Sequence, residues 1–121
     1  LSKELSNMKP ENHIKIMKRL LNNHPKLMLD ITWRVLEDNY FKNHRRIYTR
    51  FFNDYSERIL PGTDFVASSN KNFESYKTDL EVTSQIHKYL SDEAFRNIVL
   101  GNNYFKLLGF YGVICSCQSV Q

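Results

Sequence analysis

The side chains that could carry out chemistry are few, and they lie far apart along the chain. The four histidines are His13, His24, His44 and His87. The sequence contains no glycine-rich phosphate loop, no Gly-x-Ser-x-Gly elbow and no His-Glu-x-x-His motif. The sequence therefore predicts a protein that is not an enzyme and uses no cofactor.

Two other patterns could bind a metal or move protons. Cys115 and Cys117 are separated by one residue, whereas the paired cysteines of structural zinc sites usually lie two to four residues apart. Adjacent carboxylates occur at 37–38 and 92–93, where helix capping and solvation explain them more simply than acid–base catalysis. We therefore expect no metal site. Two cysteines are too few for a disulfide framework, so we expect reduced thiols and an intracellular protein.

The strongest candidate for ligand binding is a cluster of cations, called the basic strip below. Its residues are Lys42, Arg45, Arg46 and Arg50. Their i, i+3, i+4, i+8 spacing predicts one helix surface that could hold phosphates or an acidic peptide. The alternative is an ordinary solvated face with Asp54 and Glu57 as partial counter-charges. Residues 1–50 carry a net charge of +6 and residues 51–121 carry −2, so an acidic partner would approach the first half.

The second candidate is the apolar run at residues 104–115. The run is too short to span a membrane. It is either the central core helix of a bundle or a surface that leans on a partner or on further sequence, including a second copy of the chain. The residues expected at such an interface are Tyr104, Phe105, Leu108 and Phe110.

Apolar periodicity and breakers predict the elements that position these residues. The chain has 121 residues, the length of one domain, and its opening on Leu1 is compatible with a piece of a longer chain. Glycine and proline are scarce, which favours helices. We expect a loop at 61–72 between two helical units, and helices over 10–24, 26–40, 41–60, 73–90, 91–101 and from 102 onward.

The predicted helices each carry an apolar face. The residues expected to be buried include Ile14, Met17, Leu20, Leu21, Trp33, Ile47, Tyr48, Phe51, Phe52, Tyr55, Ile59, Phe73, Tyr76, Leu80, Ile86, Leu90, Phe95, Ile98 and Val99. Ser91 is the expected N-cap of the fifth helix, and Gly101 is its expected left-handed end.

One string occurs twice, and it suggests an architecture. "VLEDNYFK" at 35–42 returns as "VLGNNYFK" at 99–106, with six of eight positions identical. Each copy ends the second helix of a tightly joined pair, so its aromatic residues could fill the same groove between stacked layers. The prediction is an all-α fold of five to six helices, either a short armadillo/HEAT-like repeat or an irregular helical bundle.

Two short strings carry a resemblance to a known family. "ITWR" at 31–34, the aromatic helix after it, and "GFYGVIC" at 109–115 resemble the Bcl-2-like proteins of poxviruses. The resemblance implies a helical bundle that binds host proteins and blocks their signalling. The chain lacks the Asn-Trp-Gly-Arg motif of that fold.

The first functional hypothesis is a non-enzymatic scaffold or adaptor module that binds another protein or an acidic peptide through a helical surface. The second is a helical nucleic-acid-binding domain that uses the basic first half. The third is an enzyme whose catalytic residues assemble from scattered positions, and the Bcl-2-like role is a minor alternative. Salt dependence separates the first two, because phosphate binding weakens steeply with salt and apolar contact does not.

Overall fold

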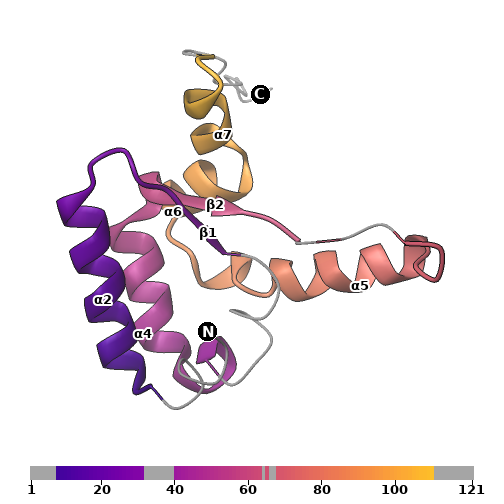
Figure 1. Ribbon diagram of the computed structural model, residues 1–121, viewed down its shortest axis with the longest axis horizontal. Helices are drawn as coiled ribbons and strands as arrows, with labels where there is room; N and C mark the ends of the chain where they lie inside the picture. Colours follow the sequence, from indigo (N-terminus) through magenta and orange to yellow (C-terminus); the bar gives the residue numbers. More distant parts are fainter. Residues whose placement is uncertain (1–7, 32–39, 64, 66–67, 111–121) are drawn as a thin grey trace, which may run out of the picture.

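The fold is mostly helical, with a small parallel sheet at its centre (Figure 1). The computed structural model describes residues 8–31, 40–63, 65 and 68–110. The prediction of a helical protein is confirmed, but the all-α class is wrong because two strands are present.

Helix α2 (Pro10–Asn23) forms as predicted, with proline in its first turn, where the missing N–H costs nothing. Ile14 and Leu21 are buried and Met17 packs against the core. Leu20, which we expected to be buried, is 40% exposed. The buried stripe is therefore narrower than the apolar pattern predicts.

Strand β1 (Leu29–Ile31) takes the place of the predicted helix at 26–40, and that prediction is wrong over 26–31, where a turn leads into the strand. β1 pairs in parallel with β2 (Ile59–Pro61), with Leu29 opposite Ile59. Each strand has only three residues, and their partners lie 30 positions away, so local periodicity carries no signal for the pairing. Trp33 lies outside the described residues.

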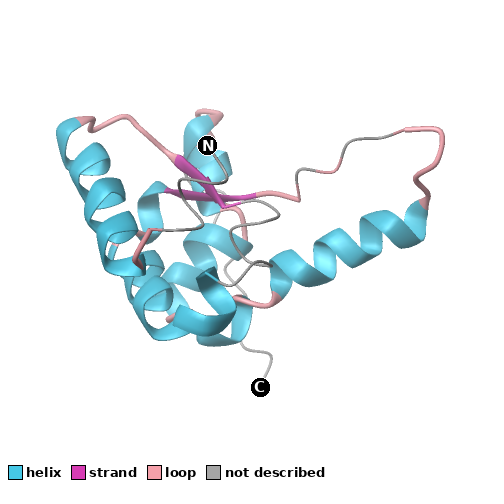
Figure 2. Ribbon diagram, turned by 60° about the horizontal axis from the view of Figure 1, so that its bottom comes forward, coloured by secondary structure: helices cyan, strands magenta, loops and turns pink. Residues whose placement is uncertain are grey.

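Helix α4 (Tyr40–Asp54) connects the two strands, as a parallel pair requires a crossover. It packs beside α2 and runs in the same direction, because His13 contacts Tyr48 and, further along both helices, Lys18 contacts Asp54 (Figures 1 and 2). The predicted aromatic face is confirmed, since Tyr48, Phe51 and Phe52 are at most 1% exposed.

The helix predicted over 41–60 ends early. A short 3-10 helix η1 (Ser56–Arg58) and then β2 follow Asp54. Ile59 is buried as predicted, but as a strand residue paired with β1. The turn at 55–58 therefore changes the direction of the chain before the proline that was expected to stop it.

Helix α5 (Phe73–Ser84) projects from the body as an arm (Figure 1). Asn72 caps its first turn by accepting a hydrogen bond from the Ser75 N–H at 3.1 Å. α5 ends at Ser84 instead of residue 90, and the 3-10 helix η2 (His87–Tyr89) follows. The predicted burial of Phe73, Tyr76 and Leu80 is wrong, because they are 71%, 37% and 46% exposed.

The last part of the described chain forms three short helical segments. α6 (Asp92–Ala94) begins at the predicted N-cap, where the Ser91 hydroxyl accepts the Ala94 N–H at 3.2 Å, and continues into a π-helical turn, η3 (Phe95–Val99). Gly101 has a φ of +83°, which confirms the predicted left-handed end. α7 (Asn102–Leu107) then stands out from the body on another side from α5 (Figure 1).

The two copies of the repeated string occupy different environments. Phe41 in the first copy is 2% exposed and lies in the core, whereas Phe105 in the second copy is 40% exposed. The two aromatic residues do not fill equivalent grooves, and residues 35–39 lie outside the described part of the chain. The armadillo/HEAT-like arrangement is therefore not confirmed.

Arg58 holds the end of α2 and the start of β1 against η1. Its Nε donates to the Leu27 carbonyl oxygen at 2.7 Å, and its Nη2 donates to the carbonyl oxygen of His24 at 2.7 Å and to that of Leu27. The planar guanidinium thus satisfies two carbonyl groups in the turn between α2 and β1.

We expect Arg58→Ala to lower the free energy of unfolding by about 1.5–3 kcal/mol, because it removes hydrogen bonds from a charged donor. Arg58→Lys should recover only part of this loss, since an ammonium lacks the planar fork. Urea unfolding followed by circular dichroism measures the effect, with the exposed Arg19→Ala as the control. Equal stability of R58A and R19A would contradict this role of Arg58.

Candidate functional site

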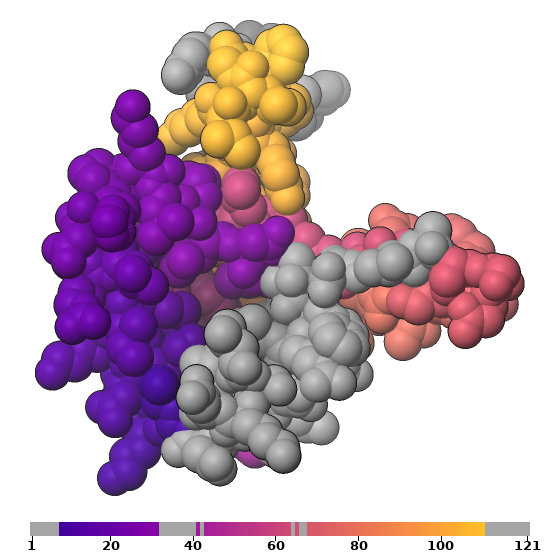
Figure 3. Space-filling view, viewed as in Figure 1, coloured from indigo at the N-terminus to yellow at the C-terminus, as the bar shows by residue number. Residues whose placement is uncertain are grey.

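The end of the described chain exposes a group of large apolar side chains, called the α7 patch below. Its members are Leu100, Tyr104, Phe105, Leu107, Leu108 and Phe110, which are between 38% and 66% exposed. Figure 3 shows this part of the molecule standing clear of the body. Residues 104–110 are therefore not a central core helix, and residues 111–115 lie outside the described range.

The first turn of α7 is fixed to the body by a buried amide. The Asn103 Nδ2 donates to the carbonyl oxygens of Ser56 and Ile59, both at 2.7 Å, and the residue is 1% exposed. A neighbouring buried bond, from Asn97 Nδ2 to Ser56 Oγ at 3.0 Å, links η3 to the same turn. α7 is short, so these tertiary bonds rather than its own helical hydrogen bonds hold it in place.

Two contacts at the edge of α7 add to this attachment. The Tyr104 hydroxyl donates to the Pro61 carbonyl oxygen, and Lys106 Nζ lies 3.2 Å from Glu57 Oε1. Burial, and to a smaller extent the Asp30 carboxylate, raises the pKa of Tyr104, which keeps the hydroxyl protonated as a donor. All four predicted interface residues are exposed, but the hydroxyl end of Tyr104 is committed to the fold.

The structure gives the residues of the basic strip different surroundings. The Arg45 guanidinium lies 4.5 Å from the centre of the Tyr89 ring, a cation–π contact with η2. Arg50 is 84% exposed and lies 4.0 Å from Asp54, which also pairs with Lys18 of α2 at 3.7 Å. Arg46 is exposed, and the side chain of Lys42 lies outside the described part.

The strip is therefore not one continuous row of free cations. α4 has a non-helical residue at His44, within the strip. Arg45 packs toward η2, whereas Arg50 and Asp54 lie toward α2. Lys15 and Arg19 of α2 are exposed as well.

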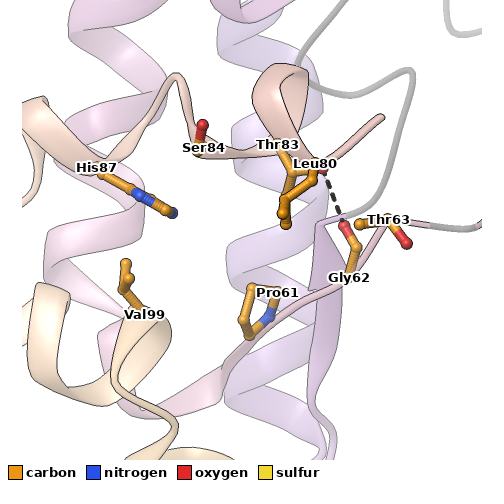
Figure 4. Close-up of a pocket in the computed structure, with 8 residues that line it drawn as sticks. All are labelled: Pro61, Gly62, Thr63, Leu80, Thr83, Ser84, His87 and Val99. Atoms are coloured by element: carbon orange, nitrogen blue, oxygen red, sulfur yellow. Dashed lines mark hydrogen bonds between the residues drawn. The ribbon is translucent and has the colours of Figure 1, made fainter. Parts of the chain in front are cut away.

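A cleft lies at the base of the α5 arm and was not predicted. Its volume is about 330 Å³, and its lining residues are Pro61, Gly62, Thr63, Leu80, Thr83, Ser84, His87 and Val99. Figure 4 shows His87 and Val99 on one side of the opening, with Leu80 and Thr83 on the other. The Thr83 hydroxyl donates to the Asp79 carbonyl oxygen at 2.8 Å and lies 3.3 Å from that of Gly62.

The described residues do not bring metal-ligating side chains together. Within them, no group of three or more His, Cys, Asp or Glu side chains could hold a metal ion. In the same part of the chain, no helix is both long and apolar enough to cross a membrane.

Sequence reasoning found part of the α7 patch and missed the α5 surface. Leu107 belongs to the same apolar run as the predicted interface residues, and the absence of charge between Tyr104 and Phe110 other than Lys106 was the available signal. Leu100 precedes that run and was not predicted. The exposure of Phe73 had no comparable signal, because an apolar stripe on a helix looks the same whether the core or another molecule covers it.

No protein-family model matches the chain, and no curated protein and no solved structure is detectably similar to it. The functional interpretation therefore depends on the surfaces described above.

We expect Asn103→Ala to destabilise the fold through the Ser56 and Ile59 carbonyl groups, which would lose a buried donor. The cost should be about 1–3 kcal/mol for each group left unpaired. Asn102→Ala is the matched control, since Asn102 is the adjacent asparagine and is only partly buried. Urea unfolding measures both variants, and hydrogen exchange of the α7 amides should accelerate in N103A alone. A loss no larger than that of N102A would contradict the anchoring role.

The stability of the protein should fall as the solution is acidified. Burial lowers the pKa of His13 and that of His87 below the usual 6.5. On acidification, these two histidines therefore become protonated in the unfolded chain at a higher pH than in the folded chain. The stabilisation that is present above pH 6.5 is lost as the pH falls through the two lowered pKa values. The neutral ring of His13 lies 2.9 Å from the Tyr48 hydroxyl through Nδ1.

Urea unfolding at a series of pH values tests this dependence. His13→Gln should reduce the loss of stability on acidification, because glutamine can accept a hydrogen bond from the Tyr48 hydroxyl but does not titrate. The same substitution at the exposed His44 is the control. A pH dependence in H13Q as steep as in the unchanged chain would contradict the prediction.

Proposed function

We propose that the protein is a non-enzymatic protein–protein interaction module, of the scaffold or adaptor kind, that binds its partner through the α7 patch. One observation carries the proposal. Large apolar side chains are exposed on and beside a short helix whose first turn is fixed by the buried Asn103. Exposed apolar surface of this kind favours an interaction site, and a fixed helix binds without a large ordering cost.

The chemistry of the α7 patch indicates the kind of surface that it fits. Lys106 is the only charged residue of α7, and Glu57 already neutralises it. An apolar groove or helix face of another protein matches this patch better than an acidic peptide does. A second copy of the chain could offer such a face as well. Light scattering of the purified chain, described below, distinguishes a second copy from a different protein.

Nucleic-acid binding is the alternative, and the exposed cations of α2 and α4 favour it. Lys15, Arg19, Arg46 and Arg50 are exposed on two helices that lie side by side. Such a surface could follow a phosphate backbone without reading its bases. The pairing of Arg50 and Lys18 with Asp54 reduces its positive charge, so we rank it second.

Two further hypotheses have weaker support. The Bcl-2-like role implies a helical bundle, but Ile31 of the "ITWR" string closes strand β1. A short armadillo/HEAT-like repeat would also present helical surfaces, although the different burial of Phe41 and Phe105 disfavours it. An intracellular location remains part of the proposal and rests on the two cysteines.

The test replaces apolar side chains of the α7 patch by carboxylates. We expect Leu107→Asp and Leu108→Asp each to weaken binding of co-purifying proteins about tenfold or more, because a charge buried at an apolar contact costs upward of about 1.4 kcal/mol. Leu20→Asp, at a leucine 40% exposed on α2, is the matched control. Quantitative mass spectrometry of proteins retained by the full chain, together with light scattering of the purified chain, gives the readout.

Two results would contradict the proposal. In the first, L107D, L108D and the control L20D retain the same proteins equally well. Alternatively, the bound material could be nucleic acid, lost steeply between about 50 and 200 mM salt and lost in R46E/R50E, which would favour the alternative.

A further inference from the structure

The α5 arm exposes a second apolar surface, separate from the α7 patch. Phe73, Tyr76 and Leu80 are spaced i, i+3, i+7, which places them on one side of the helix. Phe73 at the tip is 71% exposed, although it is among the largest apolar side chains of the described chain. Tyr76 is partly covered by the ring of Phe65, at 5.4 Å. Figure 2 shows the arm extending away from the other helices.

The apolar stripe leads directly into the cleft at the base of the arm. Leu80 belongs to both, and Thr83 and Ser84, one turn further along, continue into the lining of the cleft. The Thr83 and Ser84 hydroxyls donate to the carbonyl oxygens of Asp79 and Glu81 at 2.8 and 2.9 Å. Because these donors are already engaged, the cleft offers mainly apolar surface, and its volume of about 330 Å³ has room for one aromatic side chain.

Two of the charged residues of α5, Lys77 and Glu81, can pair with each other between two antiparallel copies of the helix. Lys77 and Glu81 lie one turn apart, with Nζ 4.0 Å from Oε1. If two α5 helices lie antiparallel about a twofold axis beside Asp79, each Lys77 faces the Glu81 of the other copy. Opposite charges then meet twice across a single isologous contact, and the same register places Asp79 opposite Asp79, one pair of like charges.

The same axis brings Phe73 to the cleft of the other copy. Phe73 is six residues from Asp79, a distance of about 9 Å along the helix at 1.5 Å per residue. The residue six positions beyond Asp79 in the other direction is Gln85, which lies between Ser84 and His87 of the cleft lining. The bodies of the two copies would lie at opposite ends of the pair, because each arm joins its body at the C-terminal end of α5 (Figure 1).

We propose that α5 is a self-association arm. Two copies of the chain pair their α5 helices antiparallel, with each Phe73 seated in the Leu80–His87 cleft of the other copy and Lys77 facing Glu81 across the axis. The contact covers the stripe that the fold leaves exposed and leaves the α7 patch free for a different protein. The inference does not rest on the proposed function, since the two surfaces share no residue.

Light scattering of the full chain over a range of concentrations gives the first test. We expect a dimer whose dissociation constant rises at least tenfold in Phe73→Asp, because the variant would place a carboxylate in the apolar cleft. The variant should fold normally, as Phe73 is mostly exposed in a single copy. Circular dichroism verifies this. L108D serves as the control at the other apolar surface and should leave the dimer unchanged.

Charge reversal tests the antiparallel geometry itself. Lys77→Glu and Glu81→Lys should each weaken the dimer, because each brings like charges together. The double variant K77E/E81K should restore it. Mixing K77E with E81K should give a heterodimer, since one chain then carries two negative charges where the other carries two positive ones.

Several results would overturn the inference. A monomer at every concentration would do so, as would a dimer that F73D leaves intact. A dimer abolished by L108D but not by F73D would assign self-association to the α7 patch instead. Failure of the K77E and E81K mixture to associate would exclude the antiparallel register. None of these results bears on whether the α7 patch binds another protein, so the two proposals can fail separately.

Discussion

The parallel pairing of β1 with β2 is the constraint on which the remaining structure depends. It places three residues of β2 at the centre of the molecule, where their carbonyl groups must find partners. On one side those partners come from β1. On the other side they come from side chains, because Asn103 binds the Ile59 carbonyl oxygen and Tyr104 binds that of Pro61. α4 makes the crossover between the two strands and packs beside α2. α7 lies against β2, where it supplies the side chains that bind the β2 carbonyl groups.

The accuracy of the sequence-based predictions depended on the range of the interactions. α2, the Ser91 cap, the Gly101 turn and the aromatic face of α4 were predicted correctly, because each depends on residues within one or two turns. The strands were missed, because three-residue segments gain their stability from a partner 30 positions away. Phe73 was placed in the core for a related reason, since periodicity identifies an apolar face and not what covers it. The cleft depends on residues from β2, α5 and η3 and was not predictable locally.

The fold keeps its main apolar surfaces on separate projections. The core lies between α2, α4, the sheet and the α6–η3 segment, while α5 and α7 extend from it on different sides (Figure 1). In the proposals above, one projection binds a second copy and the other binds a different protein. A dimer of this kind would present two α7 patches, and two linked weak contacts bind an oligomeric or clustered partner more tightly than one contact does. The positive surface of α2 and α4 would then affect the rate of encounter with acidic partners more than the final affinity.

The outer edge of β2 has a consequence for the solubility of the folded chain. An exposed strand edge invites pairing with strands of other molecules, and such pairing leads toward aggregates. In β2 the carbonyl oxygens of residues 59 and 61 are occupied by side chains of α7, and Pro61 has no N–H to offer. An incoming strand would therefore find both carbonyl oxygens engaged and no N–H at Pro61. The asparagine and tyrosine that attach α7 thus also protect a hydrophobic strand against edge-to-edge association.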